Sequence, residues 1–586
     1  MARTCTPDSL WNLLRPLGHG ESVIHRTARQ GKVLRTRLAN GWIVPTGTVA
    51  VQLRGQSYLA VVVEHFRARE VLAQHLDLVC DALTSARVPF RVLEPARQQP
   101  FVVVVEATQR GRALSALHEH LGETPTYVAA MAGRRKQAAQ RLGRRAGGRP
   151  PKVVRVFRVL AETGGGVLSG DELGCDLEFW RVTRADEPAP PGGEARPKGS
   201  LIAPRRNRWT DVITPAALEI ERRHIAGRDR PTVAAIRHPH LFDVHEPIDV
   251  VYTWVDGSDP DWVARKSAAL RDRGVPVDHE LSANSSRFTS RDELRYSLRS
   301  LESHADWVRH VYLVTDDQVP PWLQVGHPGL TVVNHRELFA GRGRLPTFNS
   351  HAIESQLHHI DGLSEHFLYL NDDVFFGRPV APEQFFTGNG MALFHQSATK
   401  LGLTTSAPCD VPLMSAGKNN RELLIERFGR GITSKLQHVP HALRRSVLLD
   451  IERDFPEQVG ETASAQFRSQ TDLSIAASLA HYYGYATGRA VPGRLAYFYA
   501  DIARDDTTVR LQSLLSKRAA DVFCLNDHDS HKRDHFEQVT MIQQFLDAYF
   551  PLPSSFERGV ESCAPPQLSL SVGPGSSTHR ADVAKG

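Results

Sequence analysis

The sequence predicts an α/β protein with a Rossmann-like mixed sheet in its main domain, a small N-terminal α/β domain and a disordered C-terminal tail. Two observations support this fold class. Short apolar runs rich in β-branched residues, which are typical of buried strands, alternate with amphipathic helical patterns. The chain is also too long, at 586 residues, for one ordinary hydrophobic core.

The first region, residues 1–185, has the pattern of a small α/β unit. Strands are expected at Tyr58–Val63 and Phe101–Glu106, and helices at Arg69–Ala86 and Ala113–Leu121. No motif for a site stands out in this region, so its role is left open.

The next segments separate two domains. Lys152–Val182 is expected to form a pair of strands around three consecutive glycines, and residues 186–200 are rich in proline and glycine, which is typical of a linker. The main domain is then expected over residues 201–558. The polar tail, residues 559–586, is expected to be disordered.

Residues 134–149 are rich in arginine and contain no acidic residue. Such a segment is typical of a solvated helix or linker, but it also fits a basic arm that binds nucleic acid or anionic lipid. No aromatic residues lie between the arginines to stack on bases.

Within the main domain a helix is expected between two strands. Ser290–Glu293 has the pattern of a capping box, and Leu294, Leu298 and Leu301 then recur at the spacing of one buried helical face. The apolar run Val311–Val314 follows. This strand–helix–strand order predicts a Rossmann-like sheet.

Acidic residues follow three of the expected strands, at the edge where open α/β sheets bind ligands. They are Asp256 and Asp259 after Ile248–Val251, Asp316 and Asp317 after Val311–Val314, and Asp372 and Asp373 after Phe367–Leu370. Together they suggest a site for a cation or a metal-bound phosphate. Each loop alone is equally consistent with a turn, because Asp and Asn favour turns.

Composition narrows the functional classes. The hydrophobic share of 41% and the charged share of 23% are typical of a soluble globular protein. No run approaches the ~18 apolar residues that cross a bilayer, and the N-terminus has no apolar core of signal-peptide length, so a cytoplasmic location is expected. Six cysteines without a CxxC pair argue against a disulfide scaffold or a zinc site. The net charge of +6 suits anionic substrates or an anionic membrane face but establishes neither.

Four blocks of the main domain carry a family resemblance. The first is IDVVYTWVDGSDPDW from Ile248; the second runs SRFTSRDELRYSLRSLES from Ser286 and LPTFNSHAIESQLHHIDGLSEHFLYLNDDVFFG from Leu345. The third includes HVPH from His438 and FRSQTDLS from Phe467, and the fourth is VFCLNDHD from Val522. Over roughly residues 246–558 the chain thus resembles the Stealth proteins, which include bacterial capsule and exopolysaccharide phosphotransferases and the animal lysosomal GlcNAc-1-phosphotransferase.

The resemblance implies transfer of a sugar-1-phosphate from a nucleotide-sugar donor to a hydroxyl of a polysaccharide or oligosaccharide acceptor. A nucleoside monophosphate leaves, and the product is a phosphodiester-linked polysaccharide. Such chemistry needs a divalent metal, Mg²⁺ or Mn²⁺, held by hard oxygen ligands, an arginine for the phosphate oxygens, and a base for the acceptor proton.

The resemblance also implies roles for single residues. The expected metal ligands are Asp372, Asp373, Asn526 and Asp527. Arg468 would hold phosphate oxygens, His438 is the favoured base, and His441 is either its helper or the start of a helix. Asp256 is a second candidate base, although some family members have Asn at this position.

Further residues are expected to bind substrate: Asp259, Arg287, Asn349 and Glu354. Arg287 would reach the nucleotide phosphates, whereas Asn349 and Glu354 would position the sugar. Arginines recur every four residues from Arg287 to Arg299, which is also the pattern of a solvated basic helix face.

Two other functions stay open. A metal-dependent glycosyltransferase would use the same donor, and its acidic metal motif resembles NDD here, but it would release a nucleoside diphosphate. A polysaccharide- or nucleic-acid-binding protein would use residues 134–149 and would leave the acidic loops unexplained, so no nucleic-acid partner is expected. Peripheral association with the inner face of the membrane is compatible with the expected cytoplasmic location.

Overall fold

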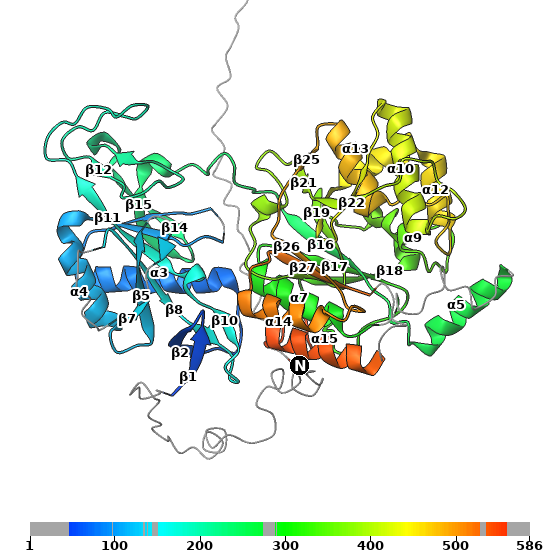
Figure 1. Ribbon diagram of the computed structural model, residues 1–586. Coiled ribbons are helices and arrows are strands. Elements are labelled where there is room, and N and C mark those ends of the chain that lie inside the picture. The colour runs from blue at the N-terminus through cyan, green and yellow to red at the C-terminus, as the bar shows by residue number, and fades with distance from the viewer. Residues whose placement is uncertain are drawn as a thin grey trace, which may run out of the picture.

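The protein is a mixed α/β structure, as the sequence predicts. The computed structural model describes residues 46–96, 98–132, 135–136, 139–142, 151–273, 288, 290–527 and 535–559. In Figure 1 the blue-to-cyan segments gather in one body and the green-to-red segments in another. Among the described residues, no helix combines the length and the apolar character needed to cross a membrane. The expected tail lies almost wholly outside this described part of the chain.

Within the described residues, the N-terminal body holds three sheets. Their orders are β1-β2-β9-β10, then β13-β12-β11-β8-β5-β6, which is extended by β4 and β3 beside β11 and by β7 beside β5, and the two-stranded β14-β15. Its strands are β1 (Thr48–Leu53), β2 (Gln56–Val62), β3 (Arg91–Leu93), β4 (Val102–Glu106), β5 (Thr126–Ala132), β6 (Arg135–Lys136), β7 (Gln140–Arg141), β8 (Val153–Arg158), β9 (Leu160–Ala161), β10 (Val167–Ser169), β11 (Cys175–Val182), β12 (Leu201–Ile202), β13 (Val212–Ile213), β14 (Ile220–Ile225) and β15 (Arg228–Val233). Its α-helices are α3 (Ala68–Ser85) and α4 (Arg110–Leu121).

Four of these elements confirm the expected strands and helices of the N-terminal unit: β2, α3, β4 and α4. Lys152–Val182, expected as one pair of strands, instead contains four strands. The glycines turn the chain between β9 and β10, which pair antiparallel, while β8 and β11 are longer and pair within the larger sheet.

The proline- and glycine-rich stretch, residues 186–200, does not separate the two bodies. Directly after it, β12 pairs antiparallel with β11, and β13 pairs with β12. The β14–β15 hairpin also belongs to the N-terminal body, because the Thr232 hydroxyl donates to the Val92 carbonyl of β3 at 2.7 Å. The chain therefore leaves the N-terminal body after β15 rather than at residue 201.

The second body is built on a five-stranded sheet, β18-β17-β16-β19-β24. β16 (Ile248–Thr253), β17 (Val311–Thr315), β18 (Leu330–Asn334) and β19 (His366–Asn371) are parallel, and β24 (His441–Arg444) is antiparallel to β19. Its register aligns Thr253 with Val314 and Asn371, so the carboxyl ends of these strands share one edge. Loops that carry acidic residues leave from this edge.

A three-stranded sheet, β20-β27-β26, lies beside the five-stranded one. The chain passes from one sheet to the other in the short turn between β19 and β20 (Val374–Phe376). β27 (Val522–Asn526) pairs antiparallel with β20 and parallel with β26 (Tyr497–Asp501). Residues 372–373 and the end of β27 are thereby brought to the same place.

The remaining elements surround these two sheets. The helices are α5 (Pro260–Asp272), α7 (Glu293–His304), α8 (His335–Phe339), α9 (Ser350–Glu354), α10 (Pro412–Phe428), α11 (Arg445–Asp454), α12 (Pro456–Ser464), α13 (Ala480–Ala486), α14 (Thr507–Lys517) and α15 (His535–Tyr549). Shorter turns of this body are η6 (Leu357–His359), η7 (Pro382–Gln384) and the π-helical turn η8 (Ile475–Leu479). The N-terminal body has η1 (Ala107–Gln109), η2 (Asp171–Leu173), η3 (Pro215–Ala217) and η4 (Ala234–Ile236). The other strands are β21 (Ala392–Phe394), β22 (Gln396–Lys400), β23 (Ser434–Leu436) and β25 (Ala490–Pro492).

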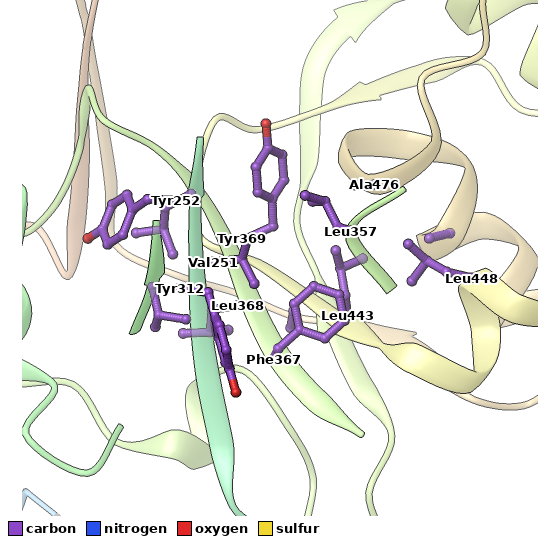
Figure 2. Packing of buried hydrophobic residues seen from close by; sticks show 14 of the residues in the cluster. Val251, Tyr252, Tyr312, Leu357, Phe367, Leu368, Tyr369, Leu443, Leu448 and Ala476 are labelled. Carbon is purple, nitrogen blue, oxygen red and sulfur yellow. The ribbon is translucent and has the colours of Figure 1, made fainter. Parts of the chain in front are cut away.

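The main hydrophobic core holds the five-stranded sheet between helices. Figure 2 shows Tyr252 on one side of β16 and Leu357, Leu443, Leu448 and Ala476 on the other. The hydroxyl of Tyr252 lies 2.8 Å from that of Ser297 on α7, which ties this helix to the sheet. Continuous burial along β16 explains its apolar, β-branched sequence.

Helix α7 differs from its sequence-based expectation in two ways. The predicted capping box is not formed, because Asp292 at the helix start has φ 65° and caps nothing with its side chain. The arginines are not a solvated face either. Arg291 and Arg299 are buried, and Arg299 forms an ion pair with Glu557 at 2.7 Å. The predicted apolar face of Leu294, Leu298 and Leu301 is confirmed.

Candidate active site

A cavity of about 660 Å³ opens at the carboxyl edge of the five-stranded sheet, where the three-stranded sheet meets it. This volume is in the range typical of small-molecule sites. Polar and charged residues that line it include Arg291, Glu293, Glu354, Asp372, Asp373, Lys435, His438, His441, Arg468, Asn526 and Asp527. Eight of the residues singled out in the sequence as site candidates are therefore brought together here.

The acidic end of the cavity is formed by the turn after β19 and the end of β27. Asn526 donates from its amide nitrogen to Asp373 Oδ2 at 3.3 Å, and the Cys524 thiol also faces that oxygen at 3.5 Å. Backbone pairing fixes the turn, because the Leu525 amide donates to the Asp373 carbonyl at 3.0 Å. The two family blocks that hold NDD and LND thus lie side by side.

Burial makes negative charge unfavourable at this acidic end. The pKa of Asp373 is raised to about 7 by burial, with the neighbouring Glu293 adding to the shift. Burial, Glu293 and Asp373 together raise the pKa of Asp372 well above its usual range. Burial also raises the pKa of Glu293 itself, and the Arg291 guanidinium opposes the shift. Carboxyl groups packed in this way are typical of a site that receives a cation.

Arg291 is the cation that the fold itself supplies to these acids. It pairs with Asp527 Oδ2 at 2.5 Å and with Glu293 Oε1 at 3.5 Å, and all three side chains are almost fully buried. Asp373 Oδ1 and Asp527 Oδ1 are nevertheless buried without a hydrogen-bond partner among the described residues. Since buried polar atoms are almost always satisfied, these two oxygens are suited to a divalent metal.

The candidate metal ligands are not gathered into a closed cage. In the described part of the chain, the one group of three His, Cys, Asp or Glu ligand atoms within 4.8 Å of one another lies elsewhere, at His358, His359 and Glu452. Nε2 of His358 and Nε2 of His359 lie 2.8 and 3.1 Å from Glu452 Oε2. A metal-bound histidine usually donates its other ring N–H, but the buried Nδ1 of His358 has no partner among the described residues. This cluster is therefore a hydrogen-bonded clamp between η6 and α11.

The basic end of the cavity holds Arg468 and Lys435. Among the described residues, the only side-chain hydrogen bond of Arg468 runs from Nη2 to the Ser350 hydroxyl at 3.0 Å, which leaves most of its donors unused. Lys435 has no ion-pair partner in that part of the chain, and burial lowers its pKa below the usual value. Both cations can therefore contact an anionic group in the cavity.

Glu354 stands beside Arg468 and is held by the fold. The Tyr369 hydroxyl donates to its Oε1 at 3.4 Å, and the backbone amide of Ala477, in the π-helical turn η8, also supports the carboxylate. Burial raises the pKa of Glu354, while His351 and Arg468 oppose the shift. The irregular turn thus directs a backbone donor into the site, a use for which π-helical turns are known.

Two histidines of the HVPH segment face the cavity. His438 lies in the loop between β23 and β24, with its ring centre 6.4 Å from that of Tyr499. His441 is the first residue of β24, so its expected role as a helix start is wrong; α11 begins at Arg445. Its Nδ1 lies 3.2 Å from Nε2 of His481, which is buried behind the cavity wall.

Several sequence candidates do not line this cavity. Asp256 accepts from the backbone and hydroxyl of Ser258 at 2.8 and 2.6 Å, which shapes the loop after β16. Asp259 caps α5, where its Oδ1 accepts from the Asp261 amide at 2.9 Å. Neither contributes to the lining, although Thr253, Trp254 and Val255 of the same loop do. Arg287 lies outside the described residues.

Three further residues singled out in the sequence have structural partners. Asn349 is fully buried and donates to Asp472 Oδ2 at 2.9 Å, so it joins α9 to the segment that carries Arg468 rather than facing the cavity. Asp316, in the loop after β17, pairs with Arg265 at 3.0 Å, and Asp317 pairs with Arg336 at 2.5 Å. Of the three acidic loops expected to meet, only the one after β19 supplies acids to the cavity.

The sequence reasoning missed Lys435 and His481, and it gave Arg291 and Glu293 no place in the site. Arg291 and Glu293 were visible as a charged pair at the start of an expected helix, inside the second family block. No sequence signal marks Lys435 or His481, because their place follows from the pairing of β23 with β22 and from the π-helical turn before α13.

Comparison with known proteins identifies a matching family and several similar proteins. Models of the four Stealth conserved regions match in order: region 1 at residues 246–274, region 2 at 287–394, region 3 at 437–485 and region 4 at 512–565. An exopolysaccharide phosphotransferase of Streptomyces coelicolor is 47% identical over 503 residues, which cover 83% of this chain and 82% of the relative. A second one from that organism is 42% identical, over 78% of this chain and 84% of the relative. The exopolysaccharide phosphotransferase CpsY of Mycobacterium tuberculosis is 39% identical, over 70% and 74%.

Proposed function

Because the chain belongs to the Stealth protein family, we propose that it is an exopolysaccharide phosphotransferase that moves a sugar-1-phosphate from a nucleotide sugar to a saccharide hydroxyl. Relatives at 39–47% identity are named as such enzymes. The observation that carries the proposal is one cavity whose lining combines buried acids with the cations Arg468 and Lys435 and with two histidines. A pyrophosphate needs this pairing of charges, whereas a neutral sugar alone does not.

The donor's pyrophosphate lies in this proposal between the two ends of the cavity. Arg468 presents a planar fork to two phosphate oxygens, and Lys435 contacts a third as a point charge. Glu354 accepts from sugar hydroxyls, since its Oε2 is buried with no hydrogen-bond partner among the described residues. These contacts hold the phosphorus nearest the sugar in place for attack.

Asp372, Asp373, Asn526 and Asp527 would hold Mg²⁺ or Mn²⁺, since hard oxygen donors suit these ions. When bound, the metal supplies positive charge that neutralises the pyrophosphate. Arg291 keeps Asp527 in place from behind, so loss of this guanidinium would leave a buried carboxylate unpaired.

His438 takes the proton of the acceptor hydroxyl. An imidazole has an unperturbed pKa of about 6.5, close to working pH, which suits it to this transfer. The backbone of His438 is tied to Tyr497, a residue that also lines the cavity, so the loop that carries the base is fixed. As the proton leaves, the acceptor oxygen bonds to phosphorus, the bond from phosphorus to the nucleotide breaks, and the sugar C1–O bond stays intact.

The proposal also covers the arrangement of the sheet, the substrates and the cellular location. The order β18-β17-β16-β19 with parallel strands supports a Rossmann-like arrangement, with the donor at the carboxyl edge of the sheet. The partners are a nucleotide-sugar donor and a polysaccharide or oligosaccharide acceptor. A cytoplasmic location, with peripheral contact to the inner face of the membrane, places the enzyme near both.

Purified, metal-stripped protein tests this function with a panel of nucleotide sugars and an oligosaccharide acceptor. We expect donor turnover that appears on addition of Mg²⁺ or Mn²⁺ and is abolished by excess EDTA. The His438→Gln variant should still bind the donor, measured by calorimetry, and should lose transfer. Full turnover in EDTA would remove the metal from the proposal, and a fully active His438→Gln would remove the base.

A further inference from the structure

His481 contacts a histidine of the cavity from behind and has no role in the mechanism so far. Its Nε2 lies 3.2 Å from Nδ1 of His441, within hydrogen-bond distance. His481 is 2% exposed and does not line the cavity, whereas His441 does. The two residues come from β24 and α13, so the contact is made by the tertiary fold and not by a local turn.

Both imidazoles are neutral at working pH. Burial lowers the pKa of His441 well below its usual value, and the nearby His481, His438 and His395 add to the effect. Burial lowers the pKa of His481 to about 3, with His395 contributing. The ring of Tyr369 is stacked on that of His441, with centres 6.3 Å apart. Tyr369 carries no negative charge that could raise the pKa of His441, because its own pKa is raised well above the usual range.

A hydrogen bond between two neutral imidazoles needs one N–H and one lone pair, which leaves two arrangements. If His441 donates from Nδ1, the proton of His481 must sit on its own Nδ1. That atom is buried and has no hydrogen-bond partner among the described residues, so the arrangement leaves an N–H group unsatisfied. If His481 donates from Nε2, its Nδ1 keeps only a lone pair, and orphaned acceptors are the more tolerated kind.

The cavity side of the pair favours the same arrangement. When His481 donates, the proton of His441 is on Nε2, the ring nitrogen that makes no hydrogen bond within the described residues. The Nε2–H group of His441 then faces the anionic nucleotide sugar and forms a charge-assisted hydrogen bond with a phosphate oxygen. In the opposite arrangement a lone pair would face the phosphate oxygens and repel them.

We propose that His481 is a positioning residue, which donates to Nδ1 of His441 and thereby fixes His441 as a neutral hydrogen-bond donor to the phosphate oxygens. His441 is then not an alternative base, and proton removal is left to His438. This inference rests on the proposed phosphotransfer for the identity of the oxygens but not for the direction of the hydrogen bond.

Three variants separate positioning from simple packing. In His481→Gln the amide nitrogen takes the place of Nε2 and can still donate to His441. In His481→Asn the amide is equally polar but too short, and His481→Leu removes the donor. We expect His481→Gln to keep kcat within roughly threefold, whereas Asn and Leu lower kcat by about 10- to 100-fold with little change in KM, the scale for weakening one donor to transition-state charge.

The direction of the hydrogen bond is measured directly on the wild-type chain. Long-range ¹H–¹⁵N spectra of ¹⁵N-histidine-labelled protein report which ring nitrogen carries the proton, with His441 assigned by the signals lost in His441→Gln. We expect the proton of His441 on Nε2. A proton on Nδ1, or an unimpaired and folded His481→Leu, would overturn the inference. The spectrum needs no turnover, so its result stands even if the reaction proves to be another one.

Discussion

Asp373 is the residue on which the candidate metal site depends most. One of its oxygens is buried and unsatisfied, and the other is held by Asn526 and Cys524. We expect Asp373→Asn to keep the fold, since the amide has the same shape, and to lower metal-dependent turnover by about two orders of magnitude or more, as for loss of one preorganised charge. Turnover measured against metal concentration checks this.

Asp317→Asn is the matched control for that change. Asp317 also follows a strand of the five-stranded sheet, but it pairs with Arg336 and lies outside the cavity lining. Exposed ion pairs contribute about 0–1 kcal/mol, so this variant should turn over like the wild type. Equal effects of the two substitutions would mean that the acids act through stability and not as ligands.

Arg468 offers a second test at the residue level. Its fork has only the Ser350 hydroxyl as a side-chain hydrogen-bond partner among the described residues. Arg468→Lys keeps the charge but cannot bind two phosphate oxygens in one plane, so we expect kcat to fall by about 100-fold. Arg336→Lys on the surface is the control. Near wild-type kcat for Arg468→Lys would assign the residue a point-charge role.

Residues of the candidate site were predictable where they belong to a sequence motif. They were unpredictable where tertiary contacts determine whether a side chain faces the cavity. The NDD and LND acids, Arg468 and the histidine pair were assigned to the candidate site from the family's sequence motifs, and all of them line the cavity. Asn349 looked equally suitable, yet it bonds to Asp472 across the fold. No local pattern distinguishes an amide that faces a cavity from one that is satisfied by a distant carboxylate.

At the scale of elements, the clamp between η6 and α11 makes a prediction about pH. Hydrogen bonds from His358, and to a lesser extent the charges of both histidines, hold the pKa of Glu452 at about 2, below its usual 4.5. A carboxylate with a lowered pKa stabilises the fold above pH 4.5, and this contribution is lost as the pH falls from 4.5 towards 2. Glu452→Gln should therefore lower the melting temperature at pH 7.

The difference between Glu452→Gln and the wild type should narrow as the pH is lowered through this range. Glu426→Gln, at an exposed position of α10, is the control and should leave the melting curve unchanged. Melting temperatures measured by calorimetry at several pH values decide the matter. A gap that stays constant down to acid pH would show that the glutamate contributes packing and not charge.

Elements were predictable from periodicity, but their ends and surroundings were not. The buried face of α7 follows from the spacing of its leucines, whereas the expected capping box fails because Asp292 adopts a left-handed conformation. Its arginines looked solvated because sequence spacing alone cannot reveal Glu557 and Asp527, which approach from more than 200 residues away.

On the scale of the whole molecule, the N-terminal body contacts α7, the helix that begins beside the candidate site. Arg67 pairs with Glu302 of α7 at 2.5 Å, and Gln98 donates to Asp306 just beyond that helix at 3.0 Å. Both contacts lie at the carboxyl end of α7, whereas Arg291 and Glu293 lie at its start. The N-terminal body therefore contacts one end of a helix whose other end reaches the cavity.

The position of the joint leads to a prediction about truncation. A chain that begins at Leu201 keeps β12 to β15 but loses β11 and β3, against which they pair and pack. We expect it to melt at lower temperature and aggregate more than a chain that begins at His240, which removes the N-terminal body as a unit. Melting curves and light scattering compare the two. If the chain that begins at Leu201 melts at the higher temperature and aggregates less, the domain boundary lies in the proline- and glycine-rich stretch.

The most direct test of the account follows the oxygen between sugar and phosphorus. A nucleotide sugar labelled with ¹⁸O at the C1–O–P bridge is incubated with the metal-loaded enzyme and acceptor, and both products are examined by mass spectrometry. Phosphotransfer predicts that the label stays with the sugar phosphate in the polysaccharide and that an unlabelled nucleoside monophosphate leaves. Label in a released nucleoside diphosphate would contradict the account, because it would show cleavage of the C1–O bond by a glycosyltransferase.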